Sequence, residues 1–333
     1  MGYSYRDNSR TNTKLSGRLT FVFTMIVGLA CWAYGSVLEL GFPLHSETSV
    51  LPFWDNVCEV FTNIYAAYGV GLLLLLIAGF IMKRINDIEI LTRFKSQTPF
   101  LLFMILICTN AGMPPLREAT IFILSVATVM YYVFGTFETH ASIASLFNIG
   151  VLIAVTSLLF PPAIWLAPLF WYALRKFEAI TLQGFMASFV GVFIVFWYIV
   201  IWSLWKHDFS ILTAFSESVT DINIPDIKNF SIGMTVSFAF LVMSLFSIRI
   251  NRYKNGIRAT KMFLLLMDMS GWSLVMIFLY GQYSDTLFAT LCLLSSIQFA
   301  YFIESMWIKW RFAVYYLFLA ILVYSYLLPL WNF

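Results

Sequence analysis

Residues 147–177 read FNIGVLIAVTSLLFPPAIWLAPLFWYALRKF, an almost wholly apolar run that contains three prolines and ends in basic residues. As one straight helix the 31 residues would reach about 46 Å, whereas the hydrocarbon core of a bilayer is about 30 Å thick. Two full spans would need about 40 residues. The run therefore predicts a broken hairpin, in which Pro161 and Pro162 turn the chain and residues 162–174 return as a short limb.

The composition of the whole chain indicates an integral membrane protein. Of its 333 residues, 61% are hydrophobic and only 11% are charged. No stretch resembles a soluble domain, so residues 1–333 are predicted to form a single integral membrane domain, with residues 1–18 as a cytoplasmic N-terminal tail. The four cysteines, Cys31, Cys58, Cys108 and Cys292, lack the paired spacing of a metal site or a disulfide framework.

Hydropathy and proline or glycine breaks predict an all-α, polytopic transmembrane helix bundle of about eleven spans. They lie near residues 19–41, 60–82, 99–113, 118–137, 141–160, 162–174, 182–205, 230–248, 262–281, 286–303 and 312–331. The long segment 206–229 can form an interfacial amphipathic helix that ends at a turn around Pro225.

The distribution of charge predicts the orientation of the bundle. With the N-terminus inside, all but three of the 20 lysines and arginines face the cytoplasm, and the exceptions are Arg117, Lys206 and Lys228. The C-terminus is then outside. We expect a multi-pass protein of the bacterial inner membrane.

A second proline pair, Pro114–Pro115, separates the spans near 99–113 and 118–137. The two proline-broken hairpins suggest either a weak internal repeat or two independent breaks. Short, proline-interrupted segments in matching positions are typical of a binding cavity, which we expect on the extracytoplasmic side.

The first outer loop is acidic, and Glu39, Asp55 and Glu59 are its candidate catalytic residues. On a helix Asp55 and Glu59 would share one face. Such a pair can hold a divalent cation, or one member can act as a general base. Trp54 beside them could stack on a sugar ring. The alternative is an ordinary acidic outer loop, from which basic residues are excluded by topology.

Two further charges are candidate functional residues. Arg117 follows the first proline pair and can bind a lipid phosphate at the mouth of the cavity, or it can anchor the helix or pair with Glu118. Asp268 lies about seven residues inside a span, where a charge is costly. It is a candidate proton or cation relay, and the alternative is a structural pairing with Arg258 or Lys261.

The sequence contains no nucleotide-binding glycine loop, no zinc-ligand spacing and no serine-hydrolase elbow. Nucleic acid is not an expected partner. Membrane lipids are expected partners, and a polyprenyl-phosphate lipid and other membrane proteins are further candidates. No cofactor is predicted apart from the divalent cation considered above.

The stretch from residue 146 to 205 resembles a family of bacterial multi-spanning inner-membrane proteins built on a domain of unknown function. The residues that carry this resemblance are Phe147, Asn148, Gly150, Ser157, Leu158, Pro161, Pro162, Arg175 and Lys176. More distantly, the layout is similar to C-type glycosyltransferases that use polyprenyl-phosphate sugars. That resemblance implies an acidic base or metal ligand in the first outer loop, where Glu39, Asp55 and Glu59 lie.

Three functions follow from these observations. The first is a glycosyltransferase-like enzyme at the extracytoplasmic face, with Arg117 on the lipid phosphate and Asp55, Glu59 or Glu39 as the base. The second is a non-enzymatic membrane subunit of an envelope assembly or secretion complex. The third is a small transporter centred on Asp268.

Overall fold

The computed structural model describes residues 17–38, 54, 59–89, 91, 96–110, 116–136, 142–177, 181–207, 209–224, 232–250, 256–306 and 308–331. Glu39, Asp55, Pro114 and Pro115 lie outside these ranges, so the predictions that rest on them stay predictions.

The described residues are helical apart from turns, short connections and one isolated β-bridge. The helices are α1 (Arg18–Val37), α3 (Ile64–Glu89), α4 (Thr98–Cys108), α5 (Glu118–Gly135), α6 (Ile143–Leu159), α7 (Leu166–Lys176), α8 (Leu182–Lys206), α9 (Ser210–Thr220), α10 (Ile232–Ile250), α11 (Ile257–Leu279), α12 (Ser284–Ser305) and α13 (Ile308–Trp331). Two 3-10 turns, η1 (Pro161–Trp165) and η4 (Gly281–Tyr283), precede α7 and α12. The all-α prediction is confirmed for this part of the chain.

Every predicted span coincides with one helix, and α9 is the additional helix in the long segment 206–229. Eight helical segments are long and apolar enough to cross a membrane, whereas α4 and α6 are shorter apolar helices. The return limb α7 has only 11 residues. The many apolar helices indicate an integral membrane protein.

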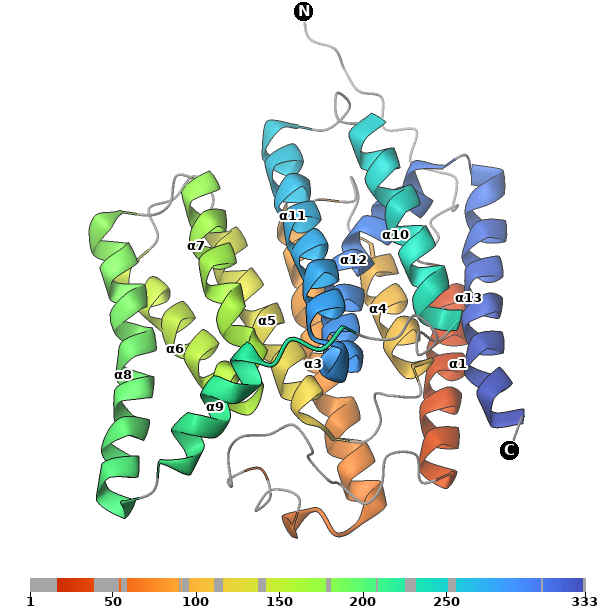
Figure 1. The fold of residues 1–333 in the computed structure, drawn as a ribbon. Coiled ribbons are helices and arrows are strands. Elements are labelled where there is room, and N and C mark those ends of the chain that lie inside the picture. The colour runs from red at the N-terminus through yellow and green to blue at the C-terminus, as the bar shows by residue number, and fades with distance from the viewer. Residues whose placement is uncertain are drawn as a thin grey trace, which may run out of the picture.

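Most successive helices run in opposite directions, with α9 and α10 as the exception, and their termini gather at two ends of the molecule (Figure 1). One end, which we call the basic end, holds the described basic residues Arg18, Lys83, Arg84, Arg175, Lys176, Arg249, Arg258, Lys261 and Arg311. The other, the acidic end, holds Glu59, Glu118, Glu217, Asp221 and Asp285 together with Arg117 and Lys206. Which end faces the cytoplasm stays a prediction.

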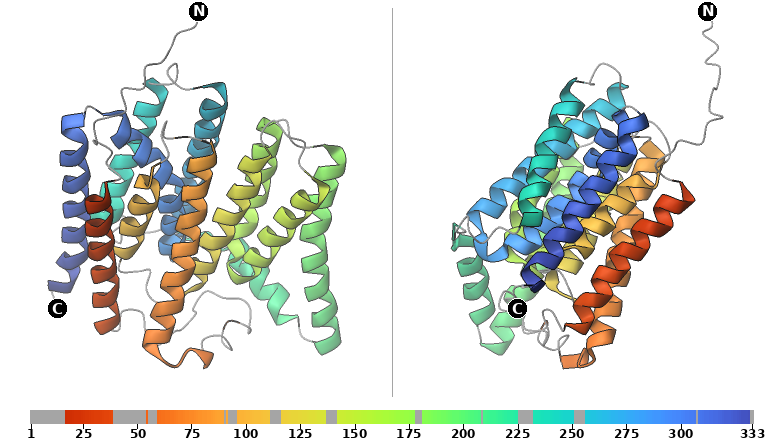
Figure 2. Two further views of the ribbon diagram at one scale, coloured as in Figure 1. Left: turned by 180° about the vertical axis from the view of Figure 1, so that it is seen from behind. Right: turned by 90° about the vertical axis from the view of Figure 1, so that its right-hand side faces the viewer.

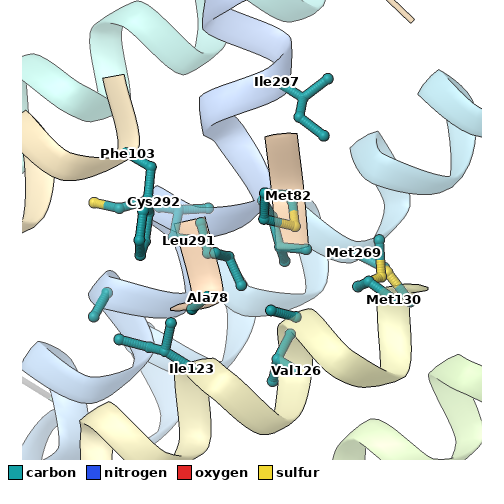
Figure 3. Close-up of a cluster of buried hydrophobic side chains, with 14 of the residues drawn as sticks. Ala78, Met82, Phe103, Ile123, Val126, Met130, Met269, Leu291, Cys292 and Ile297 are labelled. Carbon is teal, nitrogen blue, oxygen red and sulfur yellow. The ribbon is translucent and has the colours of Figure 1, made fainter. Parts of the chain in front are cut away.

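The core of the bundle is built around α12, in which every residue from Leu287 to Ile303 is buried. It packs against α4, α5, α10 and α11. All 11 residues of α4 are buried as well. Figure 3 shows the side chains of Met82, Met130 and Met269, from α3, α5 and α11, near Leu291 and Cys292 of α12.

On one side of the molecule α6, α7 and α8 form what we call the three-helix unit, which includes η1 (Figures 1 and 2). Within it, α6 and α8 cross almost at backbone contact. A Cβ atom added at Gly150 would lie 2.1 Å from the carbonyl oxygen of Ser188, and one at Gly191 would lie 2.5 Å from that of Phe147. Small residues permit such close crossings in membranes. Trp171 ties α7 to this crossing, because its Nε1 donates a hydrogen bond of 3.1 Å to the Ser188 hydroxyl.

Replacing Gly150 by alanine is expected to destabilise the protein, because the new methyl group meets backbone that cannot rotate away. Overpacking of this kind costs about 1–3 kcal/mol. The matched control is Gly271→Ala in α11, where the added methyl has no neighbour within 4 Å. Alanine there should be neutral or stabilising by up to about 1 kcal/mol. Thermal unfolding of both variants in the same detergent measures the difference, and equal melting temperatures would contradict the α6–α8 crossing.

Candidate functional site

A shallow apolar crevice, with room for about one water molecule (about 10 Å³), lies between α5 and the three-helix unit. It is lined by Phe122, Ser125, Val126 and Val129 of α5, Ile153 and Thr156 of α6, Ala163 of η1, and Leu166 and Phe170 of α7. The hydroxyl of Thr156 donates to the carbonyl of Leu152 in its own helix at 2.6 Å. The crevice therefore offers an almost entirely hydrocarbon surface. Its lining elements α5, α6, η1 and α7 belong to the proline-broken segments, and the expected position of a binding cavity on the extracytoplasmic side stays a prediction.

One face of α5 connects the crevice to the acidic end. Glu118 is four residues before Phe122 and seven before Ser125, so the three lie on one face of the helix. Aromatic rings follow the same direction, since Phe122 lies 4.8 Å from Phe160 and Phe160 lies 5.0 Å from Tyr283, measured between ring centroids.

At the acidic end of the crevice is a group that we call the polar cluster: Arg117, Glu118, Asp221, Tyr283 and Asp285. Glu118, in the first turn of α5, is only 8% exposed, and Asp285 lies in the first turn of α12. The partial positive charge of a helix N-terminus favours carboxylates in both positions. The charge of Arg117 interacts with Asp285, and Tyr283 lies within electrostatic range of Glu118 and Asp221.

The polar cluster combines one cationic group with three carboxylates and a phenol. Arg117 can bind an anionic oxygen such as that of a phosphate, and a carboxylate can accept a proton. Within the described ranges, no three His, Cys, Asp or Glu side chains come close enough to hold a metal ion. The predicted cation at Asp55 and Glu59 involves Asp55, outside these ranges, and stays a prediction.

Tyr280 joins α9 to the wall of the crevice at the acidic end. Its hydroxyl accepts a hydrogen bond of 2.9 Å from Nε1 of Trp165 in η1 and donates one of 2.6 Å to the carbonyl of Val219 in α9. The amide of Gly281 donates to the carbonyl of Asn223 at 2.7 Å. These bonds hold the end of α9 beside η1.

Toward the basic end an ion pair joins the three-helix unit to α11. The Lys176 ammonium, at the last residue of α7, lies 2.6 Å from Oδ2 of Asp268. Asp268 is in the middle of α11, eleven residues from each end of that helix. The sequence offered Arg258 or Lys261 as a structural partner of Asp268, and the partner that the structure shows is Lys176 instead. Arg258 forms a two-pronged pair with Glu89 of α3 at 2.7 and 3.1 Å.

Of the other predicted site residues, the structure describes some and not others. Arg117 lies in the polar cluster, and its binding of a lipid phosphate at a cavity mouth stays a prediction. Glu59 is exposed just before α3, while Glu39 and Asp55 lie outside the described residues. Trp54 is only 2% exposed and packs with Leu116 and Leu159, so the prediction that its ring is available to stack on a sugar is wrong.

From the sequence, Glu118 is expected only as a possible partner of Arg117, and Tyr283 and Asp285 are not among the candidate residues. The sequence did contain a signal for Glu118. It stands at the start of a predicted span and four residues before Phe122, so the two share one helical face that continues into the membrane. Comparison of the chain with protein-family models, with curated proteins and with solved structures finds no match.

Replacing Tyr280 by phenylalanine is expected to loosen the end of α9, because both hydrogen bonds of the buried hydroxyl are lost. A loss of about 1–2 kcal/mol corresponds to a roughly 5- to 30-fold change in the local opening equilibrium. Hydrogen exchange of peptides that cover residues 210–224 measures it. Tyr324→Phe is the control, because Tyr324 is 59% exposed. Unchanged exchange in Tyr280→Phe would mean that the hydroxyl does not hold α9.

Proposed function

We propose that this integral membrane protein binds a membrane lipid, with a hydrocarbon chain of the lipid in the crevice and its anionic headgroup at the polar cluster. The observation that supports the proposal is that one face of α5 runs from the crevice to the polar cluster. Along it a hydrocarbon-lined surface at Phe122, Ser125, Val126 and Val129 leads to Glu118 and the neighbouring Arg117.

Selectivity in this arrangement comes from the headgroup. The surrounding bilayer is as apolar as the crevice, so moving a chain from one to the other changes little hydrophobic free energy and gains mainly packing contacts. A phosphate beside Arg117 gains charge-assisted hydrogen bonds in a partly dehydrated place. Asp285 and Glu118 oppose an anion there, so they limit affinity and favour a headgroup that also has hydrogen-bond donors, such as sugar hydroxyls.

The resemblance to C-type glycosyltransferases extends the proposal to a polyprenyl-phosphate-linked sugar as the lipid. In that reaction the acceptor hydroxyl oxygen attacks the anomeric carbon, the bond from this carbon to the phosphate oxygen breaks, and the lipid phosphate leaves as an anion near Arg117. The proton of the hydroxyl passes to a carboxylate. Glu39, Asp55 and Glu59 are the bases proposed from the sequence, and Glu118 and Asp285 are the carboxylates of the polar cluster itself.

A second candidate is the non-enzymatic membrane subunit, which the surface of α8 favours. This helix buries only Gly184, Ser188, Gly191, Ile199 and Ser203. It exposes an unusually aromatic surface, formed by Phe189, Phe193, Trp197, Tyr198, Trp202 and Trp205. Large aromatic side chains suit the surface of a partner helix as well as lipid. Co-purification of a partner that is lost on changes in α8, but kept on changes in the polar cluster, would support the subunit.

Filling the crevice is expected to reduce the lipid that the purified protein retains. Ala163→Phe places a ring in the crevice, and Val155→Phe adds the same ring to a 45% exposed position on α6. Native mass spectrometry after gentle extraction should show less retained lipid for Ala163→Phe and none of this loss for Val155→Phe. Arg117→Gln should lower the retention of anionic lipids more than that of neutral ones. Equal retention in all variants, at equal melting temperature, would exclude lipid binding at this place.

The glycosyltransferase proposal has its own test. The amide variants Asp55→Asn, Glu59→Gln, Glu118→Gln and Asp285→Asn are each incubated with a synthetic polyprenyl-phosphate sugar and an acceptor with free hydroxyls. The variant that removes the base should abolish the release of polyprenyl phosphate while expression and retained lipid stay normal. If the unchanged protein releases none, the protein binds lipid without this chemistry. If it does and all four amide variants stay fully active, none of these four residues is the base, and Glu39→Gln is tested in the same way.

A further inference from the structure

We propose that the three-helix unit moves against α5 and α11 to open the crevice to the membrane, and that the Lys176–Asp268 ion pair holds it closed. This inference deepens the proposed lipid binding by naming how a lipid is admitted. The movement itself can be measured without any lipid ligand.

The wall that would move is η1 with α7, which contributes Ala163, Leu166 and Phe170 to the crevice. Its hydrogen bonds and ion pairs to the rest of the bundle lie at its two ends. At the acidic end Trp165 donates to Tyr280, and at the other end Lys176 pairs with Asp268. Between these contacts the wall meets α5 through the hydrocarbon of Leu166 and Phe170, and just beyond Lys176 the ring of Phe177 lies 6.1 Å from that of Phe134, measured between centroids. When the wall moves, its apolar contacts can slide past one another, whereas the Trp165–Tyr280 hydrogen bond and the Lys176–Asp268 ion pair must break.

The wall moves together with α6 and α8. Trp171 bonds α7 to Ser188, and the backbone crossing at Gly150 and Gly191 fixes α8 on α6. Since α6 packs against α5, that contact is the axis about which the unit can turn. The edge formed by α7 then moves away from α11, and in the described residues the polar link from α7 to α11 is the ion pair.

The position of the ion pair gives it strength. It joins the end of α7 to the middle of α11, and the side chains are 21% and 40% exposed at the edge of the junction. Opposite charges attract more strongly in the low dielectric of a membrane than in water. Lys176 also lies 5.6 Å from the ring of Tyr172, which supports its position. When Asp268 loses its charge, Lys176 is free to extend toward the basic end, because long basic side chains reach for the interface.

The first experiment measures the distance between two spin labels. The labels are placed on cysteines at Val190 of α8 and Val275 of α11, which are 44% and 48% exposed and lie about two helical turns or more from the ion pair along the chain. The four native cysteines are replaced, and the protein is reconstituted in bilayer nanodiscs. Asp268→Asn should add a population with a distance longer by several ångströms. Exchanging the charges, Lys176→Asp with Asp268→Lys, should restore the original distance.

A matched control breaks the other ion pair of α11. Glu89→Gln removes the partner of Arg258, but this pair joins α3 to α11 and does not involve the three-helix unit. The distance should therefore stay unchanged in Glu89→Gln. An unchanged distance in Asp268→Asn, or the same change in Glu89→Gln, would overturn the proposal.

A second measurement follows the opening of the crevice itself. Ser125, which lines the crevice, is replaced by cysteine in the same background, and its rate of reaction with a membrane-permeant maleimide is measured. Asp268→Asn should raise this rate about fivefold or more, as expected when a coupling of ordinary size is lost. The charge exchange should reverse the rise. If the distance and the rate change but no lipid is retained, the movement stands and the lipid-binding proposal fails. If lipid is retained but neither the distance nor the rate changes, the lipid-binding proposal stands and the proposed movement fails.

Discussion

A proline has no amide hydrogen and restricts the residue before it, so α6 cannot continue through Pro161 and Pro162. The chain turns there in η1 and returns as α7, which has only 11 residues. Together η1 and α7 reach about 26 Å, less than the roughly 34 Å of α11. The last residue of the short limb, Lys176, meets the middle of α11 rather than its first turn. The difference in length, about 8 Å, accounts for about half of the distance between the start of α11 and Asp268.

The polar groups of the site are placed where a membrane permits them. Carboxylates at the first turns of α5 and α12 are supported by the helix termini, and Arg117 supplies the opposite charge. Between the polar cluster and the ion pair the crevice wall is hydrocarbon, and Thr156 bonds to its own helix. A ligand that matches this distribution has one charged end and a long apolar part, which is the description of a lipid.

The helical segments of the described residues could be predicted from the sequence, because runs of apolar residues and proline breaks are local signals. The crossing of α6 and α8 was also readable in part, since Gly184, Ser188 and Gly191 recur on one helical face. Which charged residues form ion pairs could not be predicted from the sequence. Lys176 and Asp268 are 92 residues apart, and nothing in the local pattern of either distinguishes this partner from the nearer Arg258. The burial of Trp54 likewise depends on Leu116 and Leu159, which only the folded chain brings to it.

The two polar contacts of the α7 wall differ in kind, and the difference gives them different roles. The hydrogen bond between Trp165 and Tyr280 joins two neutral groups. The same Tyr280 hydroxyl also donates to the carbonyl of Val219 in α9, so the strength of the bond depends on where α9 lies. The bond between Lys176 and Asp268 depends on two charges, and loss of either leaves the other unpaired beside the membrane interior, which is costly. Events at the acidic end can thus act on the wall through α9. At the other end of the wall, only a change in charge or a competing ion can do so. The chain retains a costly pair of charges where an apolar contact would serve for packing alone, which favours a role in movement over a role in stability.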